Sequence, residues 1–470
     1  MADEVIQQVY NDILNGGTVE RQRAFDKLIE YPFEDIREFL FDGLRNNHHR
    51  IRSSCARILG QKGDETVIFP LLQAMSDDSW AIRTSAREAL QHLPEATVLP
   101  ALEGLVASQG ANIPMLKTLT AVLSGYESRE ASSILVKLIQ QREDPVLIEA
   151  VTHALGKRTD DLSITYLFHL LAHTQWNVRK TAVKALSELP FERIADRLKR
   201  ELANPNRFIH MSVIEMLISR GDDAVIDLMA DAVSSNNDLT RTNALNVLAG
   251  IGNDETYSLI VSLLGDPNPQ IVTQAVDILG KSQSGVVHRL LVRCLKSSNE
   301  SLRQNAVKTL GTMGSDDAIA VLDQMIRNES GAMKVAILRS LAQIGNRRCI
   351  RLIVQNCSIP GYADEVADIL RKLDPDLAIQ QMTNMLDEKE LFEASVKALR
   401  EQDRLKVFRA LSSKLGSGTP VQQEKAVEAM GLLGTREAIP YLEKVVEGGF
   451  HKNVNAAAAT ALQLLRKTSE

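Results

Sequence analysis

One ten-residue pattern of apolar and polar positions recurs along the chain. It reads IVTQAVDILG at residues 271–280, LRQNAVKTLG at 302–311 and IRSSCARILG at 51–60. An apolar residue opens each copy, a small residue follows four positions later, and leucine follows eight positions after the start. At about 100° per residue these three positions share one face of an α-helix. The pattern therefore predicts a helix with a single buried stripe, repeated many times.

The residue that closes each copy measures the repeat. Every step from Leu186 to Leu341 is 31 residues, and the other steps are 31 to 33 except for one of 26 between Leu373 and Leu399. Such regular spacing is the sequence signature of a repeat architecture. The closing residues are Leu28, Leu59, Leu90, Leu123, Leu155, Leu186, Leu217, Leu248, Leu279, Leu310, Leu341, Leu373, Leu399, Met430 and Leu462.

A second apolar segment lies between successive copies. Examples are TVIFPLLQAM at residues 66–75, TYSLIVSLL at 256–264 and AIAVLDQMI at 318–326, each joined to the next copy by a short polar turn. The unit is therefore a first helix, a turn and a second helix. About fifteen such pairs predict an all-α solenoid that forms a right-handed superhelix, in which each repeat contacts only its neighbours.

The same regularity predicts the domain organisation. We expect residues 1–470 to form a single α-solenoid, since the pattern runs through the whole chain. The one short step predicts a kink near residues 356–391, because a changed repeat length changes the rotation from one repeat to the next. Residues 392–470 would then form a C-terminal sub-block.

The repeat resembles HEAT repeats, specifically the short bacterial kind found in phycobilin lyases and bacterial scaffolds. The resemblance lies in a turn Asp or Asn followed by an apolar residue and Arg, as in Asp78 with Ile82 and Arg83, or Asn236 with Arg241. It implies that the arginines pair with the turn residues and stiffen the stack. For function it implies a binding scaffold in a general sense, with bacterial signalling as the setting, because such repeats serve many roles.

Composition narrows the classes of partner. The net charge is −6 and aromatic residues are 4% of the chain. Both values disfavour nucleic acid as a partner, because its binding needs basic surfaces and stacking aromatics.

The cysteine pattern indicates the compartment. The four cysteines form no CxxC pair, so reduced thiols in the cytoplasm are expected. No apolar run is long enough to predict a membrane span, and the N-terminus has no signal-peptide pattern.

Catalytic chemistry finds little support in the sequence. His169 and His173 are spaced for a shared metal ion, but Leu170 stands where a metalloprotease motif has Glu and no third ligand is evident. No histidine precedes Glu, as the di-iron dyads of deoxyhypusine hydroxylase would need. We expect no enzyme activity, metal or cofactor; a phycobilin lyase-like enzyme or enzyme subunit is the alternative.

The second helices of successive repeats supply the candidate binding surface, predicted to be the concave face of the solenoid. Three equivalent positions form an amide series, Asn243, Gln274 and Asn305. Armadillo repeats, of similar general build, bind peptide backbones through an asparagine series, although these amides could equally bridge neighbouring helices. The candidate partner-binding residues are Lys180, Lys184, Thr242, Asn243, Asn246, Thr273, Gln274, Asp277, Gln304, Asn305 and Lys308.

The two tryptophans and the glycines at the helix ends are interpreted from their positions within the repeat. Trp80 and Trp176 each lie two residues before the first apolar position of a second helix, which suggests interface anchors at one edge or structural lids on the turn. The glycines of LAGIG at 248–252 and LGTMG at 310–314 are predicted to be helix C-caps. The sequence as a whole predicts a non-catalytic scaffold that binds one or more proteins.

Overall fold

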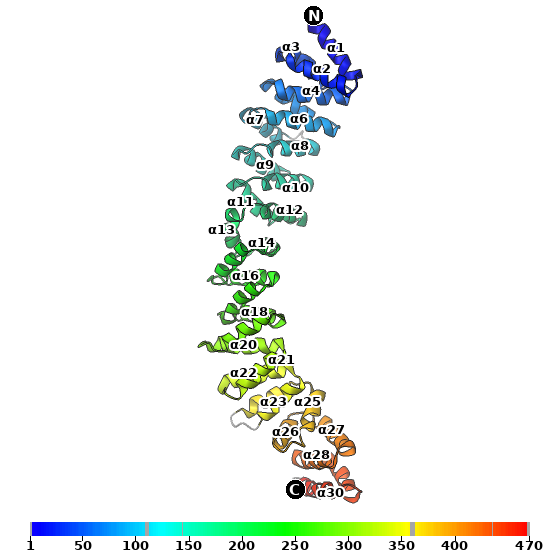
Figure 1. Ribbon diagram of the computed structural model, residues 1–470, viewed down its shortest axis with the longest axis vertical. Coiled ribbons are helices and arrows are strands. Elements are labelled where there is room, and N and C mark those ends of the chain that lie inside the picture. The colour runs from blue at the N-terminus through cyan, green and yellow to red at the C-terminus, as the bar shows by residue number, and fades with distance from the viewer. Residues whose placement is uncertain (1, 109–111, 143, 358–361, 435, 468–470) are drawn as a thin grey trace. The chain divides into compact units, whose positions relative to one another are not determined.

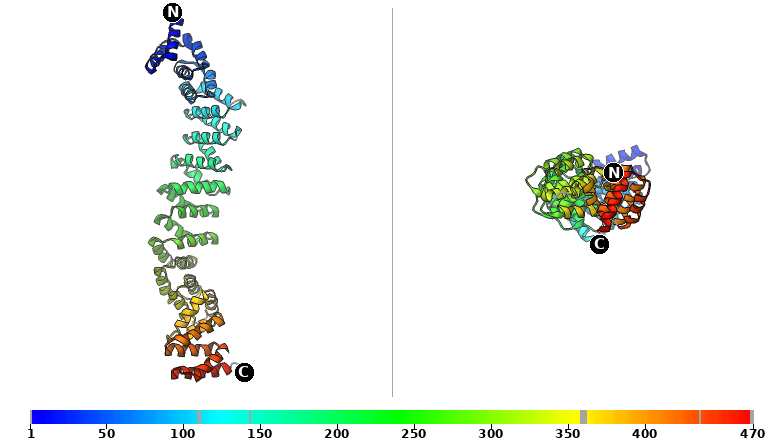
Figure 2. Two further views of the ribbon diagram at one scale, coloured as in Figure 1. Left: turned by 90° about the vertical axis from the view of Figure 1, so that its right-hand side faces the viewer. Right: turned by 90° about the horizontal axis from the view of Figure 1, so that it is seen from below.

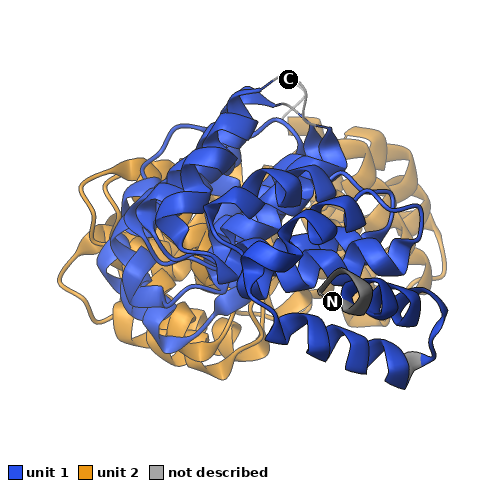
Figure 3. Ribbon diagram, turned by 90° about the horizontal axis from the view of Figure 1, so that it is seen from above, with its two compact units in different colours: residues 1–232 blue, residues 233–470 orange. Residues whose placement is uncertain are grey.

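The computed structural model describes residues 2–108, 112–142, 144–357, 362–434 and 436–467 (Figure 1). These residues form α-helices and three short 3-10 turns, and no strand occurs among them. The all-α prediction is therefore confirmed. The chain divides into two compact units, residues 1–232 and 233–470, which are coloured separately in Figure 3. Each unit is described by itself.

Unit 1 consists of short helices in antiparallel pairs. Its elements are α1 (Ala2–Asn15), α2 (Thr18–Glu30), α3 (Phe33–Gly43), α4 (His49–Lys62), η1 (Glu65–Val67), α5 (Ile68–Ala74), α6 (Trp80–His92), α7 (Glu95–Ala107), α8 (Ile113–Leu123), α9 (Arg129–Gln141), α10 (Pro145–Gly156), α11 (Asp161–Leu170), α12 (Trp176–Ser187), α13 (Phe191–Glu201), α14 (Arg207–Arg220) and α15 (Asp223–Ala232).

Unit 2 continues the same alternation. Its elements are α16 (Asp238–Ile251), α17 (Asp254–Ser262), η2 (Leu263–Gly265), α18 (Pro269–Lys281), α19 (Gly285–Cys294), α20 (Glu300–Met313), α21 (Asp316–Ile326), α22 (Gly331–Ile344), α23 (Arg347–Gln355), α24 (Ala363–Arg371), α25 (Pro375–Asn384), α26 (Phe392–Leu399), α27 (Arg404–Ser417), α28 (Pro420–Leu433), η3 (Arg436–Ala438), α29 (Ile439–Glu447) and α30 (Lys452–Lys467).

The helices form two rows within each unit. In unit 1 the even-numbered helices α4 to α14 pack on one another in chain order, and odd-numbered helices such as α5, α7 and α9 pack in a second row. Unit 2 shows the same arrangement in α16, α18, α20 and α22, opposite α17 and α19. Each layer is one helix pair, and the left view of Figure 2 shows the layers following one another in chain order within each unit. This is solenoid packing, with the even-numbered row made of the predicted second helices.

The irregular segment of unit 2 matches the position of the short step in the sequence. The 26-residue step ends in α26, which has only eight residues. Residues 358–361, within the predicted kink, lie outside the described residues. The kink near 356–391, the sub-block 392–470 and the single solenoid over 1–470 stay predictions.

The predicted core is confirmed by burial. All fifteen closing residues are buried, from Leu28 at 0% exposure to Leu462 at 8%. The small residue four positions earlier is buried as well, for example Ala275 and Ala306 at 0%. These two positions therefore form a continuous apolar seam inside each unit, which is the main stabilising feature of a stack of thin layers.

The glycine after the closing leucine allows close packing of neighbouring layers. A Cβ at Gly311 would lie 2.6 Å from Ser340 Cβ, and one at Gly156 would lie 2.5 Å from Ala185 Cβ. At Gly431 the corresponding distance, to Ala461 Cβ, is 2.8 Å. Each of these glycines is buried in one second helix and faces the second helix of the next repeat. The absence of a side chain is what lets the two helices approach so closely.

The prediction that the glycines of LAGIG and LGTMG are helix C-caps is right for the second glycine of each motif and wrong for the first. Gly252 and Gly314 follow the last helical residue with φ of 66° and 60°, so they are left-handed C-caps as predicted. Gly250 and Gly311 instead lie inside α16 and α20. Gly311 is explained by the close approach of α22, which the linear pattern does not distinguish from a cap.

Candidate protein-binding surface

The amide series does not form one exposed row. Asn243 is 3% exposed, whereas Gln274, at the equivalent position of α18, is exposed. Asn305 is half-buried, and its Nδ2 donates a hydrogen bond of 2.7 Å to the carbonyl oxygen of Leu264 in η2. Asn305 therefore links neighbouring layers of unit 2, which is the structural alternative considered from the sequence.

The other predicted residues of unit 2 lie at the surface or partly so. Thr242 and Thr273 each donate their hydroxyl to a backbone carbonyl four residues earlier, at 2.8 Å, and Gln304 donates to Glu300 at 3.1 Å. Those bonds stay within a single helix, so they neither define a ligand site nor preclude one. The residues that are exposed are Asn246, Thr273, Asp277 and Lys308, and those that are half-buried are Thr242 and Gln304.

The predicted residues of unit 1 are all exposed. Lys180 and Lys184 lie on the surface of α12, and the Lys180 ammonium lies 4.8 Å from the centroid of the Trp176 ring. Trp176 is 58% exposed and Trp80 is 72% exposed. Both side chains are therefore accessible from solvent, and the anchor and lid interpretations of the two tryptophans stay predictions.

The repeated arginine of the second helices holds the turn before it. Arg83 Nη1 donates to the carbonyl oxygens of Asp77 and Asp78 at 2.6 and 2.9 Å, and Arg179 makes the same pair of bonds to His173 and Thr174. The predicted pairing with a turn residue thus occurs through backbone oxygens in these repeats. The side chain of each arginine is a structural clamp of the turn.

Two arginines also reach the next repeat. Arg52 pairs with the carboxylate of Asp77 at 2.7 and 3.0 Å. Arg241 pairs with Asp266 at 2.6 and 2.9 Å, and these hydrogen bonds raise the pKa of the Arg241 guanidinium. The arginine ladder expected from the sequence is therefore confirmed as interlayer ion pairs at these two positions.

A row of exposed apolar side chains marks the first turns of the second helices in unit 1. Besides the two tryptophans, Val146 on α10 is 50% exposed, and Phe208 and Met211 on α14 are 36% and 54% exposed. All but Met211 lie one or two residues before the first core position of their helix. Only the tryptophans were predicted from the sequence, although the position just before the first core residue was the signal that could have identified Val146 and Phe208.

The corresponding first turns of unit 2 carry mostly polar or small residues. Asp238, Pro269, Glu300 and Gly331 occupy the positions that Trp80 and Trp176 hold in unit 1. Isolated exposed apolar residues are ordinary, but several at the starts of second helices in one unit are not. Large exposed apolar side chains at the helix starts are thus more frequent in unit 1, while unit 2 carries Val421 on α28, which is 55% exposed and lies in the register of Val146 and Phe208.

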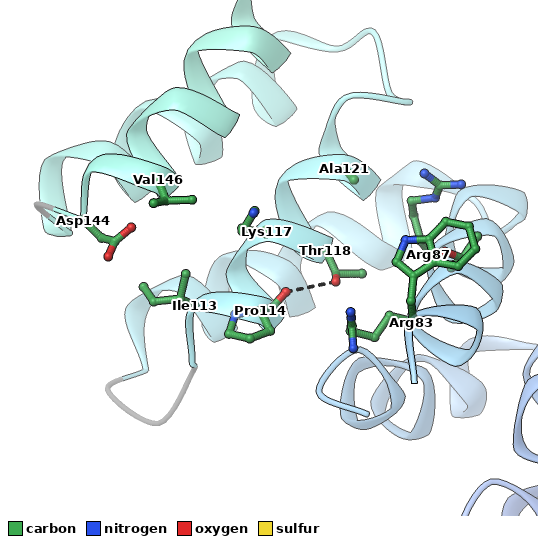
Figure 4. A pocket seen from close by; sticks show the side chains of 11 residues that line it. Arg83, Arg87, Ile113, Pro114, Lys117, Thr118, Ala121, Asp144 and Val146 are labelled. Atoms are coloured by element: carbon green, nitrogen blue, oxygen red, sulfur yellow. Dashed lines mark hydrogen bonds between the residues drawn. The ribbon is translucent and has the colours of Figure 1, made fainter. Parts of the chain in front are cut away.

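A groove lies at the start of this row. It is formed by α6, α8 and α10 and has a volume of about 520 Å³. Figure 4 shows Pro114 and Lys117 of α8 between Arg83 of α6 and Val146 of α10. The lining residues are Trp80, Arg83, Thr84, Arg87, Ile113, Pro114, Lys117, Thr118, Ala121, Asp144 and Val146.

The two histidines do not lie on one helix, as their spacing had suggested. Helix α11 ends at Leu170, so His173 lies in the following turn, where its Nδ1 accepts a hydrogen bond from the backbone N–H of Gln175 at 3.1 Å. His169 remains on the helix beside Tyr166. In the described parts of the chain no three His, Cys, Asp or Glu side chains are grouped as metal ligands. None of the helices described there combines the length and apolarity needed to cross a bilayer.

Comparison with known proteins identifies the repeat. The family model of HEAT repeats matches residues 37–113, 164–245 and 287–358. No curated protein sequence matches the chain. The matches do not single out the short bacterial subgroup of HEAT repeats.

Several solved structures align over much of the chain at low similarity. Kap121p bound to Pho4p aligns with a TM-score of 0.35 and 13% identity, over 98% of this chain and 61% of Kap121p. The structure of the Pds5–Scc1 complex aligns with a TM-score of 0.37 and 13% identity, over 96% of this chain and 82% of that chain.

Human deoxyhypusine hydroxylase aligns over 52% of this chain and 95% of its own, with a TM-score of 0.22 and 16% identity. In the comparison with Kap121p, this chain spans less than two thirds of that protein's length. Alignments with such low identity and TM-score carry no functional argument.

The matched repeats and the two rows of helices in each unit make this chain a HEAT-repeat protein with an all-α solenoid fold.

Proposed function

We propose that this chain is a non-catalytic scaffold that binds one or more proteins through unit 1. The single observation that carries the proposal is the row of exposed apolar side chains from Trp80 to Met211. Large exposed aromatic residues are frequent anchors of protein interfaces, because they bury much area with few rotatable bonds. The groove beside Trp80 adds a concave surface to that row.

The neighbouring charges support the same interpretation. Lys180 and Lys184 lie on α12 with Trp176, and Arg179 lies 4.5 Å from the centroid of the Phe208 ring. The aromatic anchors and Arg179 resemble the composition of protein interfaces, which are enriched in aromatic residues and Arg. The setting that we propose, cytoplasmic signalling in a bacterium, rests on the resemblance of the repeats to short bacterial HEAT repeats.

The experiment is a quantitative affinity purification of the tagged full-length chain from lysate of its own organism. Wild type is compared with a Trp80→Ala, Trp176→Ala double variant, and with a Lys281→Ala variant as the surface control in unit 2. We expect at least one protein recovered in near-stoichiometric amount with wild type and the control, and reduced at least tenfold with the double variant.

Two outcomes would overturn the proposal. One is that no protein is recovered above the level of an untagged control. The other is that the purified chain carries a visible-absorbing pigment or a stoichiometric metal, which would support the phycobilin lyase-like alternative. Circular dichroism of each variant checks that the fold is retained.

A further inference from the structure

The groove formed by α6, α8 and α10 has features that specify the chemistry of a partner, and this inference rests on the proposed function. Helices α6 and α8 each contribute a stripe of side chains to it, and the start of α10 contributes Asp144 and Val146. Along α8 the stripe is Pro114, Lys117, Thr118 and Ala121, at the spacing i, i+3, i+4, i+7 that places residues on one helix face. Along α6 the stripe begins at Trp80 and follows the same spacing to Arg87.

The hollow lies over short side chains of the middle helix. Pro114, Thr118 and Ala121 of α8 form the floor, while Trp80 and Arg87 of α6 are long. The Thr118 hydroxyl donates to the Pro114 carbonyl oxygen at 3.0 Å, drawn as a dashed line in Figure 4, so this hydroxyl is satisfied within its own helix. The floor is therefore mostly apolar.

The charges around the groove are predominantly positive. It is lined by three cations, Arg83, Arg87 and Lys117, and one carboxylate, Asp144. Arg87 pairs with Glu88 at 3.1 Å, and an oxygen of Asp144 accepts the backbone N–H of Leu147 at 2.9 Å. These two charges are therefore partly satisfied by the protein itself.

Two cations remain for a ligand. Arg83 is held by backbone carbonyl oxygens, which leave its formal charge in place, and Lys117 is exposed. Among the described residues neither of them forms an ion pair with a carboxylate. A ligand carboxylate would find a fixed guanidinium on one wall and an ammonium on the floor.

The apolar anchors lie at opposite sides of these cations. Trp80 belongs to α6 and Val146 to α10, with α8 between them. Adjacent packed helices are about 8–10 Å apart, so the two anchors are separated by about 16–20 Å. An extended chain covers that distance in about five or six residues, at about 3.3 Å per residue.

We infer that this groove binds an extended, acidic and apolar peptide segment of the partner protein. One or two Asp or Glu side chains of the segment pair with Arg83 and Lys117. An aliphatic or aromatic side chain at each end packs on Trp80 and on Val146. The partner class is thus a protein with an exposed acidic segment of about six residues that carries apolar residues at both ends.

The test uses a random library of 12-residue peptides, selected on the full-length wild-type chain. We expect the selected peptides to be enriched in Asp and Glu and in apolar residues. Their dissociation constants should rise at least tenfold with Lys117→Glu and with Trp80→Ala. The controls are Lys281→Glu on α18 and Leu405→Ala on α27, which are exposed residues of unit 2 outside both the groove and the apolar row, and they should leave binding within twofold.

A charge exchange makes the assignment specific. A selected peptide in which Lys replaces Asp and Glu should bind the Lys117→Glu variant better than it binds wild type. Both groove substitutions are at exposed positions, so a folded variant is expected, and thermal melting of each variant confirms it.

The outcomes separate this inference from the proposed function. Selected peptides that are basic or uncharged, or that bind the Lys117→Glu variant as well as wild type, would overturn the groove assignment. A selection that yields no peptide for wild type would also overturn it. In either case a protein partner recovered by affinity purification would leave the scaffold proposal standing, and its absence would remove both.

Discussion

Arg241 and Asp266 form a buried two-point ion pair between successive repeats of unit 2. The Nε–Oδ2 and Nη2–Oδ1 distances are 2.6 and 2.9 Å, and the two side chains are 7% and 2% exposed. The same guanidinium donates to the Ser235 carbonyl oxygen at 2.8 Å. One side chain thus connects the turn before α16 with the turn before α18.

Removal of Asp266 should strongly destabilise unit 2. The Asp266→Ala substitution leaves the Arg241 charge buried with only part of its hydrogen bonding, which costs about 3–5 kcal/mol when such a pair is broken. Asp238→Ala is the matched control, because that carboxylate contacts the same guanidinium at 2.7 Å but is 61% exposed, and exposed pairs contribute about 0–1 kcal/mol. Urea denaturation of both variants measures the difference, and equal midpoints would contradict the prediction.

Arg158 should be the corresponding stabilising residue of unit 1. Its guanidinium, 5% exposed, donates to the Ser132 hydroxyl and the Ser128 carbonyl oxygen at 2.6 Å each, and to the Leu123 carbonyl oxygen at 3.2 Å. We expect Arg158→Ala to lower the free energy of unfolding by about 3 kcal/mol, since each buried group left unsatisfied costs about 1–3 kcal/mol. The neighbouring exposed Lys157→Ala is the control and should be neutral in the same urea titration.

A side chain at Gly60 should disturb the contact between α4 and α6. A Cβ there would overlap the Ala89 backbone, so we expect Gly60→Ala to destabilise the protein by about 1–3 kcal/mol. Gly104→Ala in α7 is the opposite case, because a Cβ there meets nothing within 4 Å and alanine favours the helix by about 1 kcal/mol. Opposite shifts of the melting temperature are expected, and shifts of the same sign would count against the close-packing explanation.

Cys55 should make stability depend on alkaline pH. Burial raises the pKa of its thiol from 9.0 to about 12. Because the raised pKa belongs to the folded state, the stabilisation is complete below the unfolded thiol's pKa. It is lost as the pH rises from there towards 12, by at most about 1.4 kcal/mol per pH unit.

The measurement is the urea midpoint at pH 7.5 and at pH 10, for wild type and Cys55→Ala. We expect a smaller loss of stability between the two pH values in the variant. Other groups that titrate in this range are common to both proteins and cancel in the comparison. An identical loss would show that Cys55 is not protected from solvent in the folded state.

The amide series offers a direct test of its structural role. Asn305→Ala removes the hydrogen bond to the Leu264 carbonyl oxygen and should cost about 1 kcal/mol. Gln274→Ala at the equivalent exposed position should change stability by less than about 0.5 kcal/mol. If both variants have wild-type stability and partner binding falls with Asn305→Ala, the peptide-binding interpretation of Asn305 would replace the structural one.

The sequence allowed the fold to be predicted in detail because burial repeats with the period of the helix pair. Leu279 and Ala275 could be assigned to the core from spacing alone, and both are fully buried. Exposure at other positions depends on how closely the next helix approaches, which spacing does not contain. Asn243 and Gln274 share one register, yet the first is buried and the second is exposed.

The candidate surface was harder to predict for the same reason. Trp80 was recognised by its residue type, but the groove beside it depends on the short side chains of Pro114, Thr118 and Ala121 lying beside the longer side chains of α6. Those residues are unremarkable in the linear sequence. Their role emerges only when three consecutive second helices are placed side by side.

The glycine contacts have a mechanical consequence. Steps with a buried glycine, such as α4 to α6 and α28 to α30, are among the most extensively packed pairs of second helices, whereas α12 to α14, where Ser187 follows the closing leucine, is packed less extensively. Stiffness along each unit is therefore uneven, with rigid steps separated by compliant ones. A pulling force applied along a unit would extend it first at the compliant steps, while the glycine-packed steps keep their geometry.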